Sequence, residues 1–303
     1  MLTITRIDHL GQVVPDIEKQ AALLTGLFGF VEKDRWENKD DSARGITFDV
    51  PGRSGIQWQV AQPLGDSSPL QAFLDTPRGP GVRHITMEVS DLEATAEALR
   101  EAGIEPERDD NERVEARIAP NRDPESLLFR FVPGSGTATG GLVRAEEGTL
   151  GIVALDHLCH AYRDRDELAR FLEKTLGMQE IFRTPDGEHE DLADLVMEVP
   201  GKQMFWEVIQ PVGDESFIQR FLDTRGPSPH HVTFEVADWQ KAVEACERHE
   251  VPMFDDNNGE TDGARWNDAF VHPKLTGGML VQLFWEEKPG VWVRSDKIPS
   301  GNR

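Results

Sequence analysis

Two stretches of the chain, WQVAQPLGD at residues 58–66 and WEVIQPVGD at residues 206–214, show how it is organised. They lie 148 residues apart and are identical at six of nine positions. Three further pairs of blocks repeat in the same order: DHL at 8–10 and 156–158, FLDT at 73–76 and 221–224, and RHITMEVSD at 83–91 with HHVTFEVAD at 230–238. Chance does not preserve the order of four blocks, so the chain is a tandem duplication.

The repeat divides the chain into two domains of similar length. GSGTATGG at 134–141 lies between the copies and has the composition of a flexible linker. We therefore expect a first domain at 1–133, a linker at 134–150, a second domain at 151–290 and a tail at 291–303. A chain of 303 residues is long enough for two domains with sizeable cores.

Hydrophobic periodicity in the first copy predicts an α+β fold. Strands, in which apolar and polar residues alternate, and helices, in which apolar residues recur with a period of 3.6, follow one another in the order βαβββ, twice. The expected strands are 6–14, 30–36, 45–50, 56–62, 82–89, 105–108, 114–118 and 127–132, and the expected helices are 16–28, 68–76 and 92–102. Asp91 and Asp238 precede helices and are suited to cap them. The second copy follows the same plan, which predicts four βαβββ modules.

Composition excludes several classes of partner. The formal charge is −23, which repels phosphate backbones and anionic lipid headgroups, so we expect neither nucleic acid nor a membrane as partner. Only two cysteines occur, and the chain shows no targeting or membrane-spanning segment, so the expected location is the cytoplasm. The sequence is compatible with a homodimer.

Polar residues interrupt the apolar strands at matching places. On such strands a polar side chain faces water or a functional cavity, because burial without a partner costs about 1–3 kcal/mol. Taken singly, each such residue has an ordinary structural explanation, but their duplicated occurrence favours a site. The four positions are His157, Glu207, His231 and Gln282 in the second half, and His9, Gln59, His84 and Arg130 in the first.

Two neighbouring histidines are expected to lie outside this set. Side chains alternate between the two faces of a strand. Alternation therefore places His160 off the face of His157, and it directs His230 to the face opposite His231, where packing is its expected role.

These motifs and the module order together resemble the vicinal oxygen chelate superfamily. The motifs are IDHL at 7–10, QP-x-GD at 62–66 and 210–214, HHVTFEV at 230–236 and, most specific, FVHPKLTGGMLVQL at 270–283. The likeness is nearest to methylmalonyl-CoA epimerases and glyoxalase I-like proteins, and it covers nearly the whole chain as two tandem copies. It implies that two modules curl into one cupped mixed sheet that holds a divalent metal ion.

The resemblance also implies a ligand set, with one ligand on the first and one on the fourth strand of each module. Carried over to this chain, the ligands are His157, Glu207, His231 and Gln282. Two imidazoles, a carboxylate and an amide leave two positions of an octahedron for a bidentate substrate, and Mn, Co, Ni, Fe(II), Zn and Mg all suit them. The epimerases have Glu on the closing strand, whereas this chain has Gln282 there.

The first half departs further from the family pattern. Arg130 stands where the fourth ligand belongs, and a guanidinium stays protonated and cannot coordinate a cation. His9, Gln59 and His84 are therefore expected to line a metal-free cavity. Arg130 could bind a carboxylate there, but a structural ion pair is the favoured interpretation, so we expect one metal ion per chain.

The implied reaction is proton transfer beside a Lewis acid. A metal ion with two adjacent open positions chelates vicinal oxygens of a small-molecule substrate and stabilises a developing enolate, as in epimerases, isomerases and related lyases. A base is also needed. Glu190 is the candidate, close to where the epimerases place a catalytic glutamate, with Glu188 and His189 as substitutes. A solvated acidic loop is the ordinary alternative.

Candidate substrate-binding residues are His272, Trp206 and Phe284. The ordinary alternatives are a turn-stabilising role for the histidine and core packing for the aromatic residues. An acyl-CoA substrate is implied by the resemblance alone, and a keto acid or an aromatic catabolite fits the aromatic-rich second half equally well. The basic residues available to receive an anionic ligand are scattered: Arg220, Arg225, Lys274 and Lys288.

Two other functions are open. An extradiol ring-cleaving dioxygenase shares the tandem layout, but its Fe(II) takes a carboxylate from the final strand, where this chain has Gln282. A ligand-sequestering protein without catalysis, as in antibiotic-resistance members of the superfamily, is the third interpretation. Metal analysis and oxygen uptake with catechols distinguish the three.

Overall fold

A computed structural model describes residues 2–39, 42–108, 113–117, 127–134, 144, 146–187 and 190–289. The expected flexible linker falls largely outside these residues, as do the expected tail and both Glu188 and His189. The division into a linker and a tail therefore stays a prediction.

The described residues of the first half form eight strands and three helices. The strands are β1 (Ile4–Val13), β2 (Val31–Asn38), β3 (Ala43–Asp49), β4 (Gln57–Pro63), β5 (Gly81–Val89), β6 (Glu107–Arg108), β7 (Val114–Arg117) and β8 (Leu128–Pro133). The helices are α1 (Ile17–Gly26), α2 (Pro69–Leu74) and α3 (Leu92–Glu101).

The second half repeats this order. Its strands are β9 (Ile152–Ala161), β10 (Gln179–Arg183), β11 (Leu192–Glu198), β12 (Phe205–Pro211), β13 (Ser228–Val236), β14 (Met253–Thr261), β15 (Ala264–Val271) and β16 (Leu280–Glu286). Its helices are α4 (Arg165–Leu176), α5 (Phe217–Arg225) and α6 (Trp239–Arg248). The predicted α+β fold with four βαβββ modules is confirmed.

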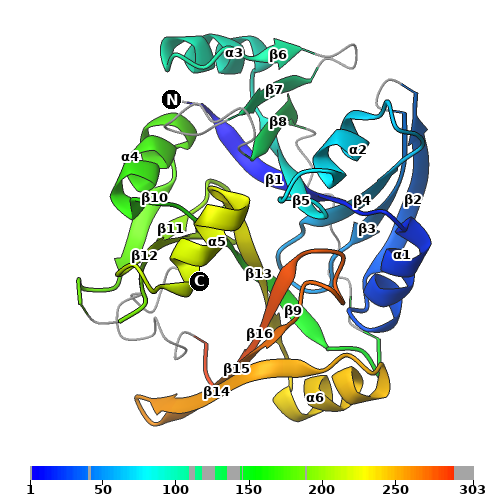
Figure 1. The fold of residues 1–303 in the computed structure, drawn as a ribbon, viewed down its shortest axis with the longest axis vertical. Coiled ribbons are helices and arrows are strands. Elements are labelled where there is room, and N and C mark those ends of the chain that lie inside the picture. Colours follow the sequence, from blue (N-terminus) through cyan, green and yellow to red (C-terminus); the bar gives the residue numbers. More distant parts are fainter. Residues whose placement is uncertain are drawn as a thin grey trace.

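Each half builds one eight-stranded mixed sheet (Figure 1). The strand orders are β2-β3-β4-β1-β5-β8-β7-β6 and β10-β11-β12-β9-β13-β16-β15-β14. Within a module the first strand pairs in parallel with the fourth, as β1 does with β4, and the two modules join through the antiparallel pair β1 and β5. This pairing brings the first and fourth strands of both modules to the centre of each sheet.

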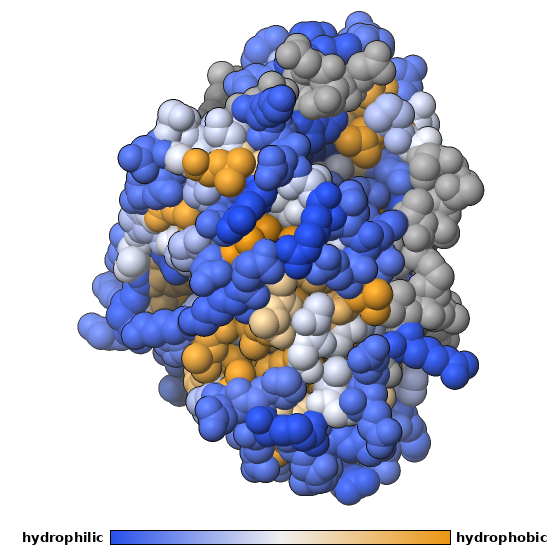
Figure 2. Space-filling model, turned by 90° about the vertical axis from the view of Figure 1, so that its right-hand side faces the viewer, coloured by the Kyte–Doolittle hydropathy of each residue, from blue (hydrophilic) through white to orange (hydrophobic). Residues whose placement is uncertain are grey.

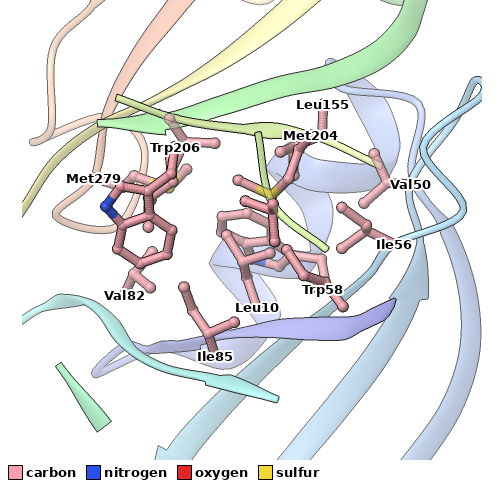
Figure 3. Packing of buried hydrophobic residues seen from close by; sticks show 14 of the residues in the cluster. Leu10, Val50, Ile56, Trp58, Val82, Ile85, Leu155, Met204, Trp206 and Met279 are labelled. Carbon is pink, nitrogen blue, oxygen red and sulfur yellow. The ribbon is translucent and has the colours of Figure 1, made fainter. Parts of the chain in front are cut away.

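One hydrophobic core holds the two halves together. The largest cluster of buried apolar residues draws on both sheets, and Figure 3 shows Trp58 and Leu10 of the first half near Met204 and Leu155 of the second. Smaller clusters lie beneath α2 and α5 on the other face of each sheet. Because strand residues alternate between faces, the residues that do not enter the main core are free to build a site.

The helix starts follow the sequence signals. The Asp91 side chain accepts a hydrogen bond of 3.0 Å from the backbone of Ala94, and that of Asp238 one of 3.2 Å from Lys241. Both caps satisfy an amide that a helix leaves without an internal partner.

None of the described helices is long and apolar enough to cross a membrane. Hydrophilic side chains cover most of the face in Figure 2.

Candidate metal centre

Three predicted ligands of the second half meet at one point. His157 on β9 and His231 on β13 approach with Nε2 atoms 3.3 Å apart, and Oε2 of Glu207 on β12 lies 3.4 Å from each of them. The strand order β12-β9-β13 places the three on adjacent strands. Both imidazoles are buried, and the Glu207 side chain keeps 18% of its surface exposed. The cluster is therefore reached from solvent beside the carboxylate.

Gln282 on β16 joins this cluster through a threonine. Its Oε1 accepts a hydrogen bond of 2.9 Å from Thr233 Oγ1, which in turn lies 2.8 Å from His157 Nε2. Thr233 pairs with both His157 and Gln282 in the register of the sheet, so all three side chains share one row. All four predicted ligands thus lie together, with a hydroxyl between the amide and the imidazole.

A buried aspartate orients His157. Asp156 Oδ2 lies 2.8 Å from Nδ1 of His157. Since an ionised carboxylate only accepts hydrogen bonds, Nδ1 carries a proton, and Nε2 is the ring nitrogen that faces Glu207 and His231. Asp156 was not among the residues predicted from the sequence, although the duplicated DHL motif contains it.

The charges of the cluster favour a bound cation. Burial opposes protonation of His157, but the carboxylates of Glu207 and Asp156 outweigh burial and raise the pKa of this imidazole. Burial alone would raise the pKa of Glu207, yet the two imidazoles hold it well below its usual range. Burial lowers the pKa of His231. The cluster therefore carries the negative charge of the Glu207 carboxylate, which a proton or a metal ion can neutralise.

The cluster fits a divalent ion on geometric grounds. Ligand atoms about 2.1 Å from an ion and at right angles to each other lie about 3 Å apart. The separations of 3.3 and 3.4 Å between the two Nε2 atoms and the carboxylate oxygen are close to that value. Two imidazole nitrogens and a carboxylate oxygen also form a ligand set common to first-row transition metals.

His230 lies against the cluster, contrary to the expectation from strand alternation. Its Nδ1 is 2.9 Å from Nδ1 of His231, and its ring packs at 4.8 Å against Phe221 of α5. The pairing of β13 with β9 shifts register between Pro229 and His231, and such an irregularity breaks the alternation of faces. His160 does lie off the face of His157, packed beside Trp206 in the main core.

The corresponding residues of the first half are arranged around a guanidinium. His9 Nε2 and His84 Nε2 are 3.2 Å apart, and Arg130 Nη1 lies 3.3 Å from His84 Nε2. Arg130 is buried, and its Nε donates a hydrogen bond of 2.5 Å to Glu115. Burial and the charge of Arg130 hold the pKa of His84 well below its ordinary value. Gln59, the counterpart of Glu207, is half-buried on β4.

The predicted substrate contacts are not at the cluster. Trp206 is fully buried on the opposite face of β12 from Glu207 and stacks on Phe129 of the first half, which fits the core-packing alternative. Phe284 is fully buried as well. His272 is exposed after β15, where its Nδ1 accepts a hydrogen bond of 3.1 Å from the backbone of Lys274, which fits the turn-stabilising alternative.

Glu190 lies in the loop between β10 and β11 and is exposed. The loop ends at Leu192, four residues along β11 from Val196, which pairs with Glu207. Four strand residues span about 13 Å, so the backbone of this loop lies well away from the carboxylate of the cluster. The structure does not bring Glu190 to the other candidates, and its role as a base stays a prediction.

Two residues of the site were missed in the sequence although a signal for each was present. Thr233 follows His231 by two positions on the same strand, so alternation places both on one face. Cys159 follows His157 in the same way, and burial together with the Glu207 carboxylate raises the pKa of its thiol well above the usual value. Neither residue type stands out in an apolar strand, which is why both were passed over.

Comparison with known protein families identifies matches in both halves. The family model described as Glyoxalase/Bleomycin resistance protein/Dioxygenase superfamily matches residues 8–118 and again residues 156–267. The two matched segments begin at Asp8 and at Asp156, the first residues of the duplicated DHL motif.

Individual relatives cover about a third of the chain. An ethylmalonyl-CoA/methylmalonyl-CoA epimerase of Cereibacter sphaeroides is 31% identical over 100 residues, which are 33% of this chain and 72% of the relative. The mitochondrial methylmalonyl-CoA epimerase of Homo sapiens is 26% identical over 99 residues, and the match spans 54% of its length. A variant of 4-hydroxymandelate synthase from Streptomyces coelicolor has the same fold, with a TM-score of 0.70, 15% identity and 94% of each chain covered.

Proposed function

The chain belongs to the glyoxalase/bleomycin resistance protein/dioxygenase superfamily, and on that premise we propose that its second half binds one divalent metal ion and catalyses an enolate-type reaction on a substrate with vicinal oxygens. The proposed reaction class is that of an epimerase, isomerase or lyase. The observation that carries the proposal is the convergence of His157, His231 and Glu207 within 3.4 Å.

The residues of the chain have distinct parts in this proposal. His157, His231 and Glu207 would hold the ion, Gln282 would supply an amide oxygen, and Asp156 fixes the tautomer of His157. A bound divalent ion would polarise two adjacent substrate oxygens and stabilise the negative charge that develops when a neighbouring proton leaves. The exposed edge of Glu207 marks the side from which a substrate approaches.

An epimerase substrate is supported by the relatives rather than by charge. The curated relatives include an ethylmalonyl-CoA/methylmalonyl-CoA epimerase, and an acyl-CoA thioester with a second carbonyl group offers the vicinal oxygens that this chemistry needs. Methylmalonyl-CoA and ethylmalonyl-CoA are therefore the first substrates to test.

Metal content tests the site directly. Elemental analysis of the purified protein is expected to give one divalent ion per chain, and His231→Ala and Glu207→Ala are expected to lose it. The repeat provides matched controls, because His84→Ala and Gln59→Ala remove the equivalent residues of the first half and should leave metal content unchanged. Full metal content in Glu207→Ala would refute the site.

Proton exchange tests the reaction. In deuterated water, the metal-loaded protein should exchange the acidic proton of methylmalonyl-CoA or ethylmalonyl-CoA, and Glu207→Ala should abolish the exchange. A protein that binds metal tightly but exchanges no proton of any thioester or keto acid would retain the site and exclude the epimerase proposal.

A second candidate is favoured by one feature of the cluster. Two histidines and one carboxylate form the ligand set of non-haem Fe(II) oxygenases, and here the carboxylate is Glu207 on β12 rather than a residue of the closing strand. Oxygen uptake with catechols in the presence of Fe(II) would support a dioxygenase. Ligand binding by metal-free protein without turnover would instead support the sequestering function.

A further inference from the structure

A small cavity of about 40 Å³ lies between the two halves of the molecule. The start of β5 borders it on one side and the start of β13 on the other, and the segment before β16 closes it through Gly278 and Met279. Four arginines line it: Arg78, Arg83, Arg117 and Arg225. No Asp or Glu is among the described residues of the lining, although the whole chain carries a charge of −23.

The cavity is built from equivalent parts of the duplication. The tripeptide Arg-Gly-Pro occurs at 78–80 after α2 and at 225–227 at the end of α5, and Arg83 stands before His84 as His230 stands before His231. All four of the residues Arg78, Arg225, Arg83 and His230 line the cavity. The fold therefore brings together two copies of one basic segment, which a single copy could not do.

Arg78 crosses from the first half into the second. Its Nε donates a hydrogen bond of 2.7 Å to the backbone oxygen of Arg225. Gly226 leaves room for this side chain, because a Cβ atom there would lie 2.6 Å from Arg78 Nη2. The contact places the Arg78 side chain against the backbone of Arg225 and Gly226, so that arginines of both halves line one cavity, where their positive charges favour a shared anion.

Arg225 is the residue that most needs such an anion. It is half-buried, and no described residue forms an ion pair with its guanidinium. Burial lowers its pKa, which reflects the cost of holding a positive charge away from water. An anion in the cavity would offset that cost.

We propose that this cavity between the halves binds a small oxyanion, in the form of a phosphate group, through Arg225, Arg78 and Arg83. Guanidinium groups bind phosphate through paired, charge-assisted hydrogen bonds. A volume of about 40 Å³ suits one such group and is too small to enclose a whole nucleotide, whose pockets are roughly 300 Å³ or more. His230 and the proposed metal ligand His231 also line the cavity, so the experiment must separate anion binding at the arginines from binding at the metal centre.

Calorimetric titration of the full-length protein with inorganic phosphate, at constant ionic strength against chloride, tests the site. Arg225→Gln should weaken phosphate binding roughly tenfold or more, as expected for the loss of a hydrogen bond to a charged group. The substitution leaves the backbone oxygen that Arg78 contacts in place. Arg220→Gln is the matched control, since Arg220 lies on the same helix, is exposed and does not line the cavity.

Glu207→Ala separates the cavity from the metal centre. Phosphate binding that survives in this variant supports the cavity, even if the proposed metal function fails, whereas binding that is lost with Glu207 would place the anion at the metal centre and overturn the proposal. If Arg225→Gln does not fold, Arg83→Gln serves the same purpose. Equal affinity in the wild type and a folded cavity variant, or no phosphate binding at all, would also overturn it.

A parallel titration with phenyl phosphate identifies the source of the anion. Binding of both compounds at the arginines indicates that the cavity receives the phosphate group of a larger ligand. Binding of inorganic phosphate alone indicates a site for the free ion.

Discussion

The imidazole of His84 lies against the backbone of Gly11, so closely that a Cβ atom on Gly11 would be 1.9 Å from His84 Cε1. The two residues are paired across β1 and β5. In the second half the same pair is Cys159 and His231, where a side chain separates the strand from the ring. The first half thus has glycine beside its histidine, and the histidine packs directly on the backbone. The second half has cysteine there, and its histidine belongs to the cluster that can receive a cation.

Gly11→Ala is expected to destabilise the protein by about 1–3 kcal/mol, because the added methyl group overpacks the site and forces the His84 ring to move. Urea denaturation measures the free energy of unfolding. Gly65→Ala is the matched control, since a Cβ at Gly65 meets nothing within 4 Å. An equal effect of the two substitutions would contradict the close packing of His84.

Arg130→Glu is expected to create a second metal site. The substitution replaces the guanidinium beside His84 with a carboxylate, and it removes the positive charge that helps to hold the pKa of His84 down. Elemental analysis and metal titration should then approach two divalent ions per chain. Arg130→Gln removes the charge without adding a strong ligand and should bind more weakly. A stoichiometry that stays at one in Arg130→Glu would contradict this prediction.

Asp156→Asn is expected to weaken metal binding by about 10- to 100-fold, because residues that orient a ligating histidine have effects of this size. Asp156 lies 2.8 Å from His157 Nδ1, and Asp8 lies 2.7 Å from His9 Nδ1 in the first half. Asp8→Asn is therefore the control and should leave metal affinity unchanged. Metal titration by calorimetry distinguishes the two variants.

The stability of the metal-free protein is expected to depend on pH through His157. Glu207 and Asp156 raise the pKa of His157 in the folded state despite burial. The contribution of His157 to the free energy of unfolding is therefore complete below the pKa of histidine in the unfolded chain, about 6.5, and is lost as the pH rises through the raised pKa of the folded state. Glu207 has a lowered pKa, so its contribution is present above about 4.5 and is lost as the pH falls through the lowered value.

The difference in unfolding free energy between wild type and Glu207→Gln isolates this pair from the other buried histidines. That difference should shrink as the pH is raised from 6.5, and metal affinity should increase over the same range because the ion competes with the proton. A difference that does not change between pH 6 and pH 9 would show that His157 and Glu207 are not coupled.

Most of the fold could be predicted from the sequence because local signals agree with one another. Alternating strands, 3.6-residue helices and the caps Asp91 and Asp238 are readable over short windows, and the duplication supplies each pattern twice. The four polar positions of each half were visible for the same reason, since each interrupts an apolar strand.

The errors arose where the outcome depends on irregular pairing or on contacts between the halves. A register shift in β13 brings His230 against His231, and alternation alone does not reveal it. An aromatic residue such as Trp206 is typical of the wall of a binding pocket, yet the core between the halves buries Trp206 against Phe129.

The amino-acid order by itself determined the duplication, the sequence of modules and the residue types available to each sheet, because these depend on neighbours along the chain. Only the tertiary structure decided that His157, Glu207 and His231 meet while Arg130 fills the equivalent place, and that Arg78 reaches the backbone of Arg225 across the two halves. Those relationships join strands and loops far apart in the chain, and they are set by how sheets pair and pack, which no local pattern encodes.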